Sequence, residues 1–269
     1  GITLSDIDYV AINSTEYDEF NKSLSESFAN KASKIRAGAR FVSNNFERLY
    51  QQSVADRIVF CSHHNAHVWS VLSVSGFDES LVLILDGDGP SGDGQSLAGR
   101  MGKAHGNEFE LIRDISGNLS LGNFYTTIIG IIGYDRFDEY KVMGLAPYGD
   151  PSRFRSVFKN LYNLKDNGEY ELSLNPVFEL WPHIHKVVNL IPPRRTEDSF
   201  LQVHKDFAAT IQETLEILTF HILEYAQRNT NLENLSFAGG VAHNCTLNGK
   251  IIESGLFKNT HAAKSNFYS

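Results

Sequence analysis

Three histidines lie close together between residues 62 and 67, in the run Ser-His-His-Asn-Ala-His. If this run opens a helix, His63 and His67 share one face, with Cβ atoms about 5–6 Å apart, which suits two imidazoles binding one metal ion. Asp86 follows the apolar run 81–85 and begins Asp-Gly-Asp-Gly. Open α/β sheets place functional residues at such strand ends. Two nitrogens and one carboxylate oxygen suit Fe(II), Zn(II) or a similar divalent ion, with positions left for a substrate.

A plainer reading of the same histidines stays open. A histidine-rich helix start can be merely polar, with a core or capping role, and the His-x-x-x-His spacing alone favours that reading. Adding the strand-borne Asp86 makes the two readings equal in weight. The neighbouring His64 and Asp88 do not allow a general base to be assigned.

A second cluster is Ser-Leu-Gly-Asn-Phe-Tyr at 120–125, followed by Glu-Tyr-Lys-Val-Met-Gly-Leu-Ala-Pro-Tyr-Gly at 139–149. Gly144 and Gly149 surround a proline, which indicates a backbone turn that a ligand can approach closely. Lys141 would supply a point charge for a phosphate. The alternative is an ordinary loop with a surface lysine, and the residues by themselves favour that alternative.

The third cluster is Ala-Gly-Gly-Val-Ala-His-Asn at 238–244. Gly239 and Gly240 come after an apolar strand and before an expected helix, so they expose backbone N–H groups beside a helix N-terminus. Such a turn can cradle an anion or a nucleotide. Most Gly-Gly pairs only turn the chain, so this cluster gains weight only together with the other two.

The composition limits the classes of function. The 269 residues carry a net charge of −8, which argues against a general nucleic-acid binder, although a small anion can bind in a locally positive pocket. The longest apolar runs are far shorter than the roughly 20 residues of a membrane helix. Two distant cysteines, Cys61 and Cys245, and the absence of a visible signal peptide predict a cytoplasmic protein without disulfides.

The elements that must hold these clusters alternate between strands and helices, which predicts the α/β class. The expected strands lie at 7–12, 57–61, 81–85 and 232–237, a hairpin lies within 92–115, and the expected helices lie at 28–53, 65–75, 205–228 and from about 244. The apolar strand 81–85 should be covered on both faces and end at Asp86. The weakly patterned stretch 152–196, which contains four prolines, is expected to be an insertion or a connecting loop.

Together the three clusters resemble the NodU/CmcH-type O-carbamoyltransferases, which include nodulation and antibiotic-tailoring enzymes. The matching stretches are HHNAH, LDGDG, SLGNFYTTIIGIIGY, EYKVMGLAPYG, FAATIQETLE and LSFAGGVAHNCTLNG, and they reach across most of the chain. The resemblance implies a two-lobed actin/sugar-kinase/Hsp70-like (ASKHA) nucleotide-binding fold. It also implies transfer of a carbamoyl group from carbamoyl adenylate, made from ATP and carbamoyl phosphate, to a hydroxyl of a small-molecule or sugar acceptor.

Carried over residue by residue, the family's metal-binding histidines fall on His63 and His67, and its first metal aspartate falls on Asp86. The expected metal is Fe(II), with Zn(II) as the second choice. Lys141 and the Gly239–Gly240 turn, with Val241 and Asn244 beside it, fall on motifs that lie near the nucleotide in this family. These last positions are therefore expected to bind ATP or carbamoyl adenylate.

The sequence also departs from the family pattern. The family's glycine-rich first strand and its YrdC-like domain are not found. The second metal aspartate is not found either, since no aspartate follows Asp206, and His243 replaces the usual leucine. We therefore expect residues 1–269 to be part of the transferase domain, incomplete at both ends, with an insertion near 152–196. Such a chain is expected to be inactive by itself and to self-associate as a homodimer.

Two other classes of function stay open at this stage. An ATP-dependent kinase on the same superfamily fold would use Mg(II) and an aspartate base, and would not need the histidine-rich helix. A non-catalytic remnant that binds nucleotide or metal is the other alternative.

Overall fold

The computed structural model describes residues 3–12, 43–90, 96–173, 189, 191–194 and 198–263. The chain divides into two compact units, one made of residues 1–67 with 89–96 and the other of 68–88 with 97–269. The boundary at residue 67 falls inside helix α3 (His63–Ser75), which is itself continuous. Each unit is described separately below.

The first unit contains a small parallel sheet. Strand β1 (Val10–Ile12) pairs with β2 (Ile58–Phe60), which confirms both predicted strands in shortened form. The guanidinium of Arg57 donates to the backbone oxygens of Leu4 and Ile7, so it ties the start of the chain to this sheet. Of the predicted helix 28–53, residues 43–50 are helical, and 28–42 lie outside the described residues.

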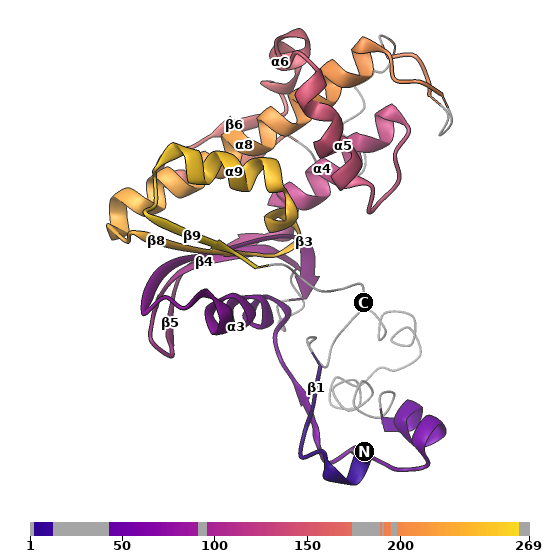
Figure 1. The fold of residues 1–269 in the computed structure, drawn as a ribbon, viewed down its shortest axis with the longest axis vertical. Helices are drawn as coiled ribbons and strands as arrows, with labels where there is room; N and C mark the ends of the chain where they lie inside the picture. The colour runs from indigo at the N-terminus through magenta and orange to yellow at the C-terminus, as the bar shows by residue number, and fades with distance from the viewer. Residues whose placement is uncertain are drawn as a thin grey trace. The chain divides into compact units, whose positions relative to one another are not determined.

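The second unit is built on a five-stranded sheet of order β5-β4-β3-β8-β9 (Figure 1). Its strands are β3 (Glu79–Pro90), β4 (Ser96–His105), β5 (Glu108–Ser116), β8 (Asn234–Ala238) and β9 (Asn259–Ala262). Strands β3, β8 and β9 run parallel, while β4 and β5 form the predicted antiparallel hairpin. Because β3 and β8 run parallel, their carboxyl ends lie at the same end of the sheet.

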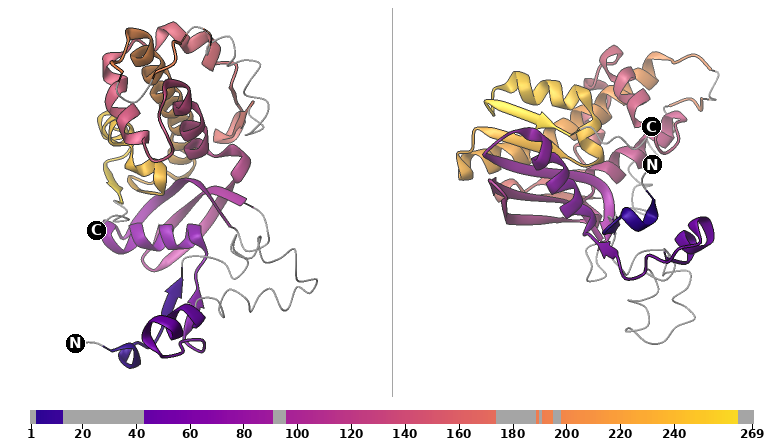
Figure 2. Two further views of the ribbon diagram at one scale, coloured as in Figure 1. Left: turned by 90° about the vertical axis from the view of Figure 1, so that its right-hand side faces the viewer. Right: turned by 60° about the horizontal axis from the view of Figure 1, so that its bottom comes forward.

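Strand β3 is apolar throughout its middle because each of its faces meets a separate hydrophobic core. Leu81, Leu83 and Leu85 lie in the larger core, which also contains residues from the long helix α8. Val82 and Ile84 lie in a smaller core with residues of α3. Figures 1 and 2 show α8 on one side of the sheet and α3 on the other. Successive side chains of β3 therefore point into opposite cores, so the sequence of this strand is an unbroken apolar run, as predicted.

Helix α8 (Gln202–Thr230) is the longest element and crosses the larger core. Its predicted apolar stripe is buried from Phe207 to Ile222, and the helix extends a few residues beyond the predicted 205–228. The other helices of this layer are α4 (Leu121–Ile129), α5 (Glu139–Leu145), α6 (Ser152–Phe158) and α9 (Cys245–Ser254). Short 3-10 turns occupy 117–119, 130–132, 146–148, 166–168 and 240–243.

Two sequence-based expectations need correction. Strand β3 does not end at Asp86 but continues to Pro90. The parallel pairing of β3 with β8 is what ends before Asp86, and its last pair is Ile84 with Ala238. The first part of the stretch 152–196 is not a plain loop, because it forms α6 and a hairpin of β6 (Tyr162–Leu164) and β7 (Tyr170–Leu172). Residues 174–188, 190 and 195–197 lie outside the described residues.

The predicted α/β class is confirmed, and a mixed sheet with helices on both faces agrees with a lobe of the ASKHA fold. Among the residues that the structure describes, none of the helices combines the length and apolar composition needed to span a membrane.

The aromatic contact between α6 and α8 generates a stability prediction. Phe207 is fully buried, and its ring lies edge-on to Phe154 and Phe158 with centroids 5.4 Å away in each case. Phe207→Ala should lower the free energy of unfolding by about 3–5 kcal/mol, because it removes buried contacts and leaves a cavity. Urea unfolding measures this change. Phe137→Ala, at a site 67% exposed, is the control, and equal losses would contradict the packing described here.

Candidate metal centre

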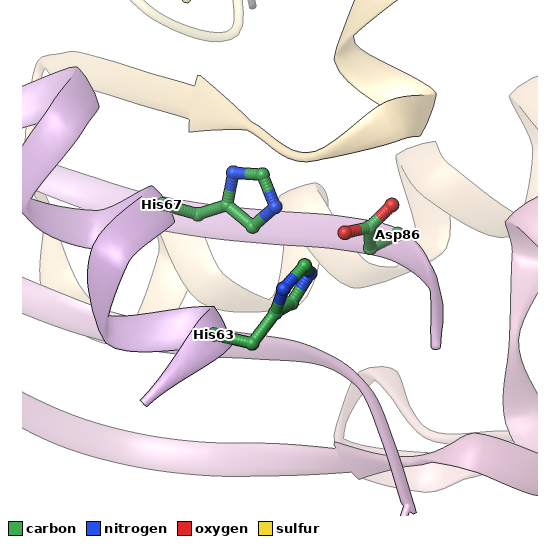
Figure 3. A group of neighbouring side chains, drawn as sticks. All are labelled: His63, His67 and Asp86. Atoms are coloured by element: carbon green, nitrogen blue, oxygen red, sulfur yellow. The ribbon is translucent and has the colours of Figure 1, made fainter. Parts of the chain in front are cut away.

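His63, His67 and Asp86 form the one group of three potential metal ligands found within the described ranges. One ligand atom from each residue lies within 4.8 Å of the other two, and each side chain is partly buried. Figure 3 shows the two imidazoles, on the first two turns of α3, facing the carboxylate on β3. The structure therefore brings together the three residues that the sequence singled out.

The two histidines share a face because α3 begins at His63, which places His67 one turn later. Their ring centroids lie 4.8 Å apart, with an angle of 85° between the ring planes. Val68 and Val71 continue the helix and pack in the smaller core with Val82 and Ile84 of β3. The packing of the later turns thus holds the helix against the strand that carries Asp86.

Glycine at 89 is a steric requirement of this arrangement. A Cβ added to Gly89 would lie 2.6 Å from Cδ2 of His63, closer than side-chain atoms approach. The second glycine of the Asp-Gly-Asp-Gly run therefore leaves room for the imidazole of His63. Asp88, between the glycines, is exposed, whereas His64 is completely buried, and neither belongs to the cluster.

Asp86 is held from several directions. Its Oδ1 accepts hydrogen bonds from the backbone N–H groups of Gly87 (2.8 Å) and Gly240 (3.0 Å). Its backbone oxygen accepts from the hydroxyl of Ser120 (2.9 Å), which also caps α4 by accepting from Asn123 N–H (2.9 Å). The carboxylate is consequently fixed by backbone groups of β3 and of the turn that follows β8, and the backbone behind it by the start of α4.

This donor set fits a divalent transition metal. Two imidazole nitrogens and one carboxylate oxygen suit Fe(II) or Zn(II), and three protein ligands leave positions for substrate or water. Two ligands about 2.1 Å from one ion lie no more than about 4.2 Å apart, so a spread of up to 4.8 Å closes through small rotations of the imidazoles. The metal role itself stays a prediction.

The Gly239–Gly240 turn lies directly beside this cluster, for a reason that the sequence did not reveal. Gly239 has φ 91°, and a Cβ there would lie 2.2 Å from the backbone oxygen of Leu85. A Cβ on Gly240 would lie 2.9 Å from Oδ1 of Asp86. Gly239 is thus required for the close packing of this turn on β3, whether or not a ligand approaches it, whereas a side chain at Gly240 would press on the carboxylate of Asp86. Val241 is buried, and Asn244 caps α9 by accepting from Leu247 N–H at 2.9 Å.

Lys141 lies on α5, exposed, with its ammonium 2.6 Å from Asp138. The hydrogen bond to Asp138 raises the pKa of Lys141, so the side chain stays positively charged. The sulfur atoms of Met143 and Cys245 are 3.6 Å apart, which puts α5 beside the first residue of α9. Lys141 therefore lies on a helix that adjoins the glycine turn, although the residue itself contacts Asp138. Its role in nucleotide binding stays a prediction.

Residues 120–125, the first part of the second sequence cluster, lie beside the site, and sequence reasoning missed one further group. Ser120 and Gly122 bring the start of α4 against β3, since a Cβ on Gly122 would lie 2.8 Å from the backbone of Asp86. Gln212 and Glu216 lie buried in α8 next to the cap of α9. Gln212 and Glu216 lie four positions apart and therefore on one face of the helix, which was the available signal for this further group.

The chain is similar in sequence to several known proteins. A family model described as carbamoyltransferase N-terminus matches residues 1–263. The chain is 39% identical over 262 residues to the nodulation protein NolNO of Sinorhizobium fredii, covering 96% of this chain and 37% of that protein. It is 42% identical over 196 residues to the nodulation protein NolO of Bradyrhizobium diazoefficiens, covering 73% and 34%. The solved structure of full-length HypF in its phosphate- and nucleotide-bound form aligns over 87% of this chain and 47% of that chain, with 14% identity and a TM-score of 0.44.

The chain therefore belongs to the carbamoyltransferase N-terminus family, as the resemblance implied. It spans only 37% and 34% of the length of the two nodulation proteins.

The cluster generates a prediction about metal affinity. His63→Ala should weaken Fe(II) or Zn(II) binding by at least about tenfold, the scale of loss seen even for residues behind the ligands. Isothermal titration calorimetry under anaerobic conditions measures this affinity. His105→Ala, which removes an exposed histidine at the end of β4, is the matched control. Equal affinities of the His63 variant and the wild type would rule out His63 as a ligand.

The contact between the Gly239–Gly240 turn and Asp86 generates a second prediction about metal affinity. In Gly240→Ala the new methyl group would press on Oδ1 of Asp86 and displace the N–H that holds it. Metal affinity should fall by about tenfold, as for other residues that orient a ligand. Gly249→Ala in α9 is the control, because a Cβ there meets no atom within 4 Å. Unchanged affinity in Gly240→Ala would show that this hydrogen bond does not orient the carboxylate.

Proposed function

We propose that this chain is the metal- and nucleotide-binding part of an O-carbamoyltransferase. The donor would be carbamoyl adenylate, made from ATP and carbamoyl phosphate, and the acceptor a hydroxyl of a small molecule or sugar. The observation that carries the proposal is the cluster of His63, His67 and Asp86 beside the Gly239–Gly240 turn, in a chain of the carbamoyltransferase N-terminus family. Two of its relatives are nodulation proteins by name, which agrees with this proposal.

The proposed reaction is an acyl transfer. The acceptor oxygen forms a bond to the carbamoyl carbon, the bond from that carbon to the phosphate oxygen breaks, and AMP leaves. The acceptor proton passes to a general base or to water. Nitrogen donates electrons into a carbamoyl carbonyl and makes it a poor electrophile, which is why attachment to a phosphate leaving group is useful.

The residues of this chain would each meet one demand of that reaction. His63, His67 and Asp86 would hold a divalent ion, which can polarise a carbonyl or neutralise a phosphate oxygen. The N–H groups of Gly240, Ala242 and Asn244 already donate within the protein, so the phosphate would be met by the N-terminus of α9, at the end of this turn. Lys141 would exchange its contact with Asp138 for one with the nucleotide. The general base stays unassigned.

The two alternative functions lead to different measurements. A kinase of the same superfamily would bind Mg(II) through carboxylates and would leave His63 and His67 without a role. Elemental analysis of the purified protein that finds iron or zinc, lost in His63→Ala, would favour the transferase. A non-catalytic remnant would bind neither AMP nor ATP, with or without added Fe(II), in calorimetry.

The charge of Lys141 generates a prediction about nucleotide affinity. Lys141→Ala should weaken AMP binding by about tenfold or more, because a charged hydrogen bond to phosphate is lost. Calorimetry in the presence of the metal measures the dissociation constant. Lys103→Ala is a close control, since Lys103 is also ion-paired, to Glu110, and its side chain is 41% exposed against 43% for Lys141. A Lys141 variant that binds AMP as tightly as the wild type would remove this residue from the nucleotide site.

A further inference from the structure

A connected set of polar side chains crosses three helices of the second unit, and Gln212 is at its centre. Gln212 lies on α8 and is 3% exposed. Its Oε1 accepts hydrogen bonds from the hydroxyl of Tyr125 (3.2 Å) and from Nδ2 of Asn244 (2.8 Å). Its Nε2 donates to Glu216 (2.9 Å) and to Oδ1 of Asn244 (3.1 Å). The amide of Gln212 thus uses both donors and both acceptor sites.

The groups around Gln212 fix the direction in which its amide points. Glu216 is paired with Lys250 at 2.5 Å, so it is an ionised acceptor and must meet the nitrogen of Gln212. Burial raises the pKa of Tyr125, with smaller contributions from Glu139 and Glu216, so its hydroxyl stays protonated and donates to the oxygen. Nitrogen and oxygen of Gln212 are then both placed to pair reciprocally with Asn244.

Asn244 is the residue at which the glycine turn becomes helix α9. Its Oδ1 accepts from Leu247 N–H and caps the helix, and it directly follows the 3-10 turn from Gly240 to His243. At its other end, this turn is held by the hydrogen bond from Gly240 to Asp86. The turn is therefore fixed at both ends, by Asp86 and by the pair of Asn244 with Gln212.

Holding the turn in this way requires a buried amide where an apolar side chain would pack at lower cost. A buried amide is tolerated only when its hydrogen bonds are made, and a fully satisfied network selects one geometry. The geometry selected here is that of Asn244 relative to α8.

We propose that Gln212 is a positioning residue for nucleotide binding. Through Asn244, the N-cap of α9, it sets the first turn of that helix in the orientation that meets the phosphate. Tyr125 and the Glu216–Lys250 pair orient the amide of Gln212 in turn. This inference rests on the proposed nucleotide function of the turn.

Two variants of Gln212 test the inference against a matched control. Gln212→Leu removes the amide and keeps the approximate volume, and Gln212→Glu replaces the donating nitrogen with an oxygen. Thr214→Val is the control, because Thr214 is also buried in α8 but donates only within the helix, to the Thr210 oxygen at 2.8 Å. AMP affinity is measured by calorimetry with metal present, and amide hydrogen exchange of residues 240–247 without nucleotide.

Gln212→Leu should bind AMP about tenfold more weakly than the wild type and should exchange faster at 240–247, while Thr214→Val changes neither. In Gln212→Glu the new carboxylate faces Glu216, and a like charge nearby raises its pKa. Its AMP affinity relative to wild type should therefore recover as pH falls from about 8 to about 6, because the protonated acid can donate again. Gln212→Leu has no group to protonate and should show no such recovery.

Each result has a separate meaning. AMP affinity and exchange that are unchanged in Gln212→Leu would overturn the positioning role. Equal effects in Thr214→Val and Gln212→Leu would overturn it too, since general destabilisation would then be the cause. If the wild type binds no AMP while exchange at 240–247 still responds to Gln212→Leu, the nucleotide function fails but positioning of the turn by Gln212 stands.

Discussion

The hydrogen bond from Gly240 N–H to Asp86 Oδ1 joins the parts of the candidate site that come from distant segments of the chain. It exists because β3 and β8 pair in parallel, with their last pair at Ile84 and Ala238, so both strands reach the same edge together. The carboxylate that would bind a metal is thereby held by the turn that would meet a phosphate. A change in the turn should therefore alter the position of the carboxylate, and a change at the carboxylate should alter the turn.

The glycines around this bond show how packing and chemistry share the same residues. Gly239 has no room for a side chain against Leu85, and Gly89 has none against His63. A glycine turn that looks like a ligand cradle in the sequence is thus first a requirement of strand packing. The close approach that results still places N–H groups beside Asp86, so the steric requirement and the functional proposal support each other.

The network of Gln212 adds a second constraint on the turn. Helix α8 buries an apolar stripe against the sheet, and this burial holds the helix in place. The same helix carries Gln212 and Glu216 toward the cap of α9, where directional hydrogen bonds replace apolar packing. Apolar contact gives the helix its stability, and the amide pair gives Asn244 a defined position.

The sequence by itself determined the features that depend on neighbours along the chain. The four-residue spacing of His63 and His67, the apolar run before Asp86, the stripe of α8 and the helix after Asn244 follow from local periodicity and capping. Where local signals were weak, as over 152–173, the expectation of an insertion or a connecting loop did not include α6, which is held by aromatic contacts with α8. Only the tertiary structure decided that Gly240 meets Asp86 and that Gln212 pairs with Asn244. Those contacts join residues 154 and 32 positions apart, and sheet pairing and helix packing, rather than spacing, bring such residues together.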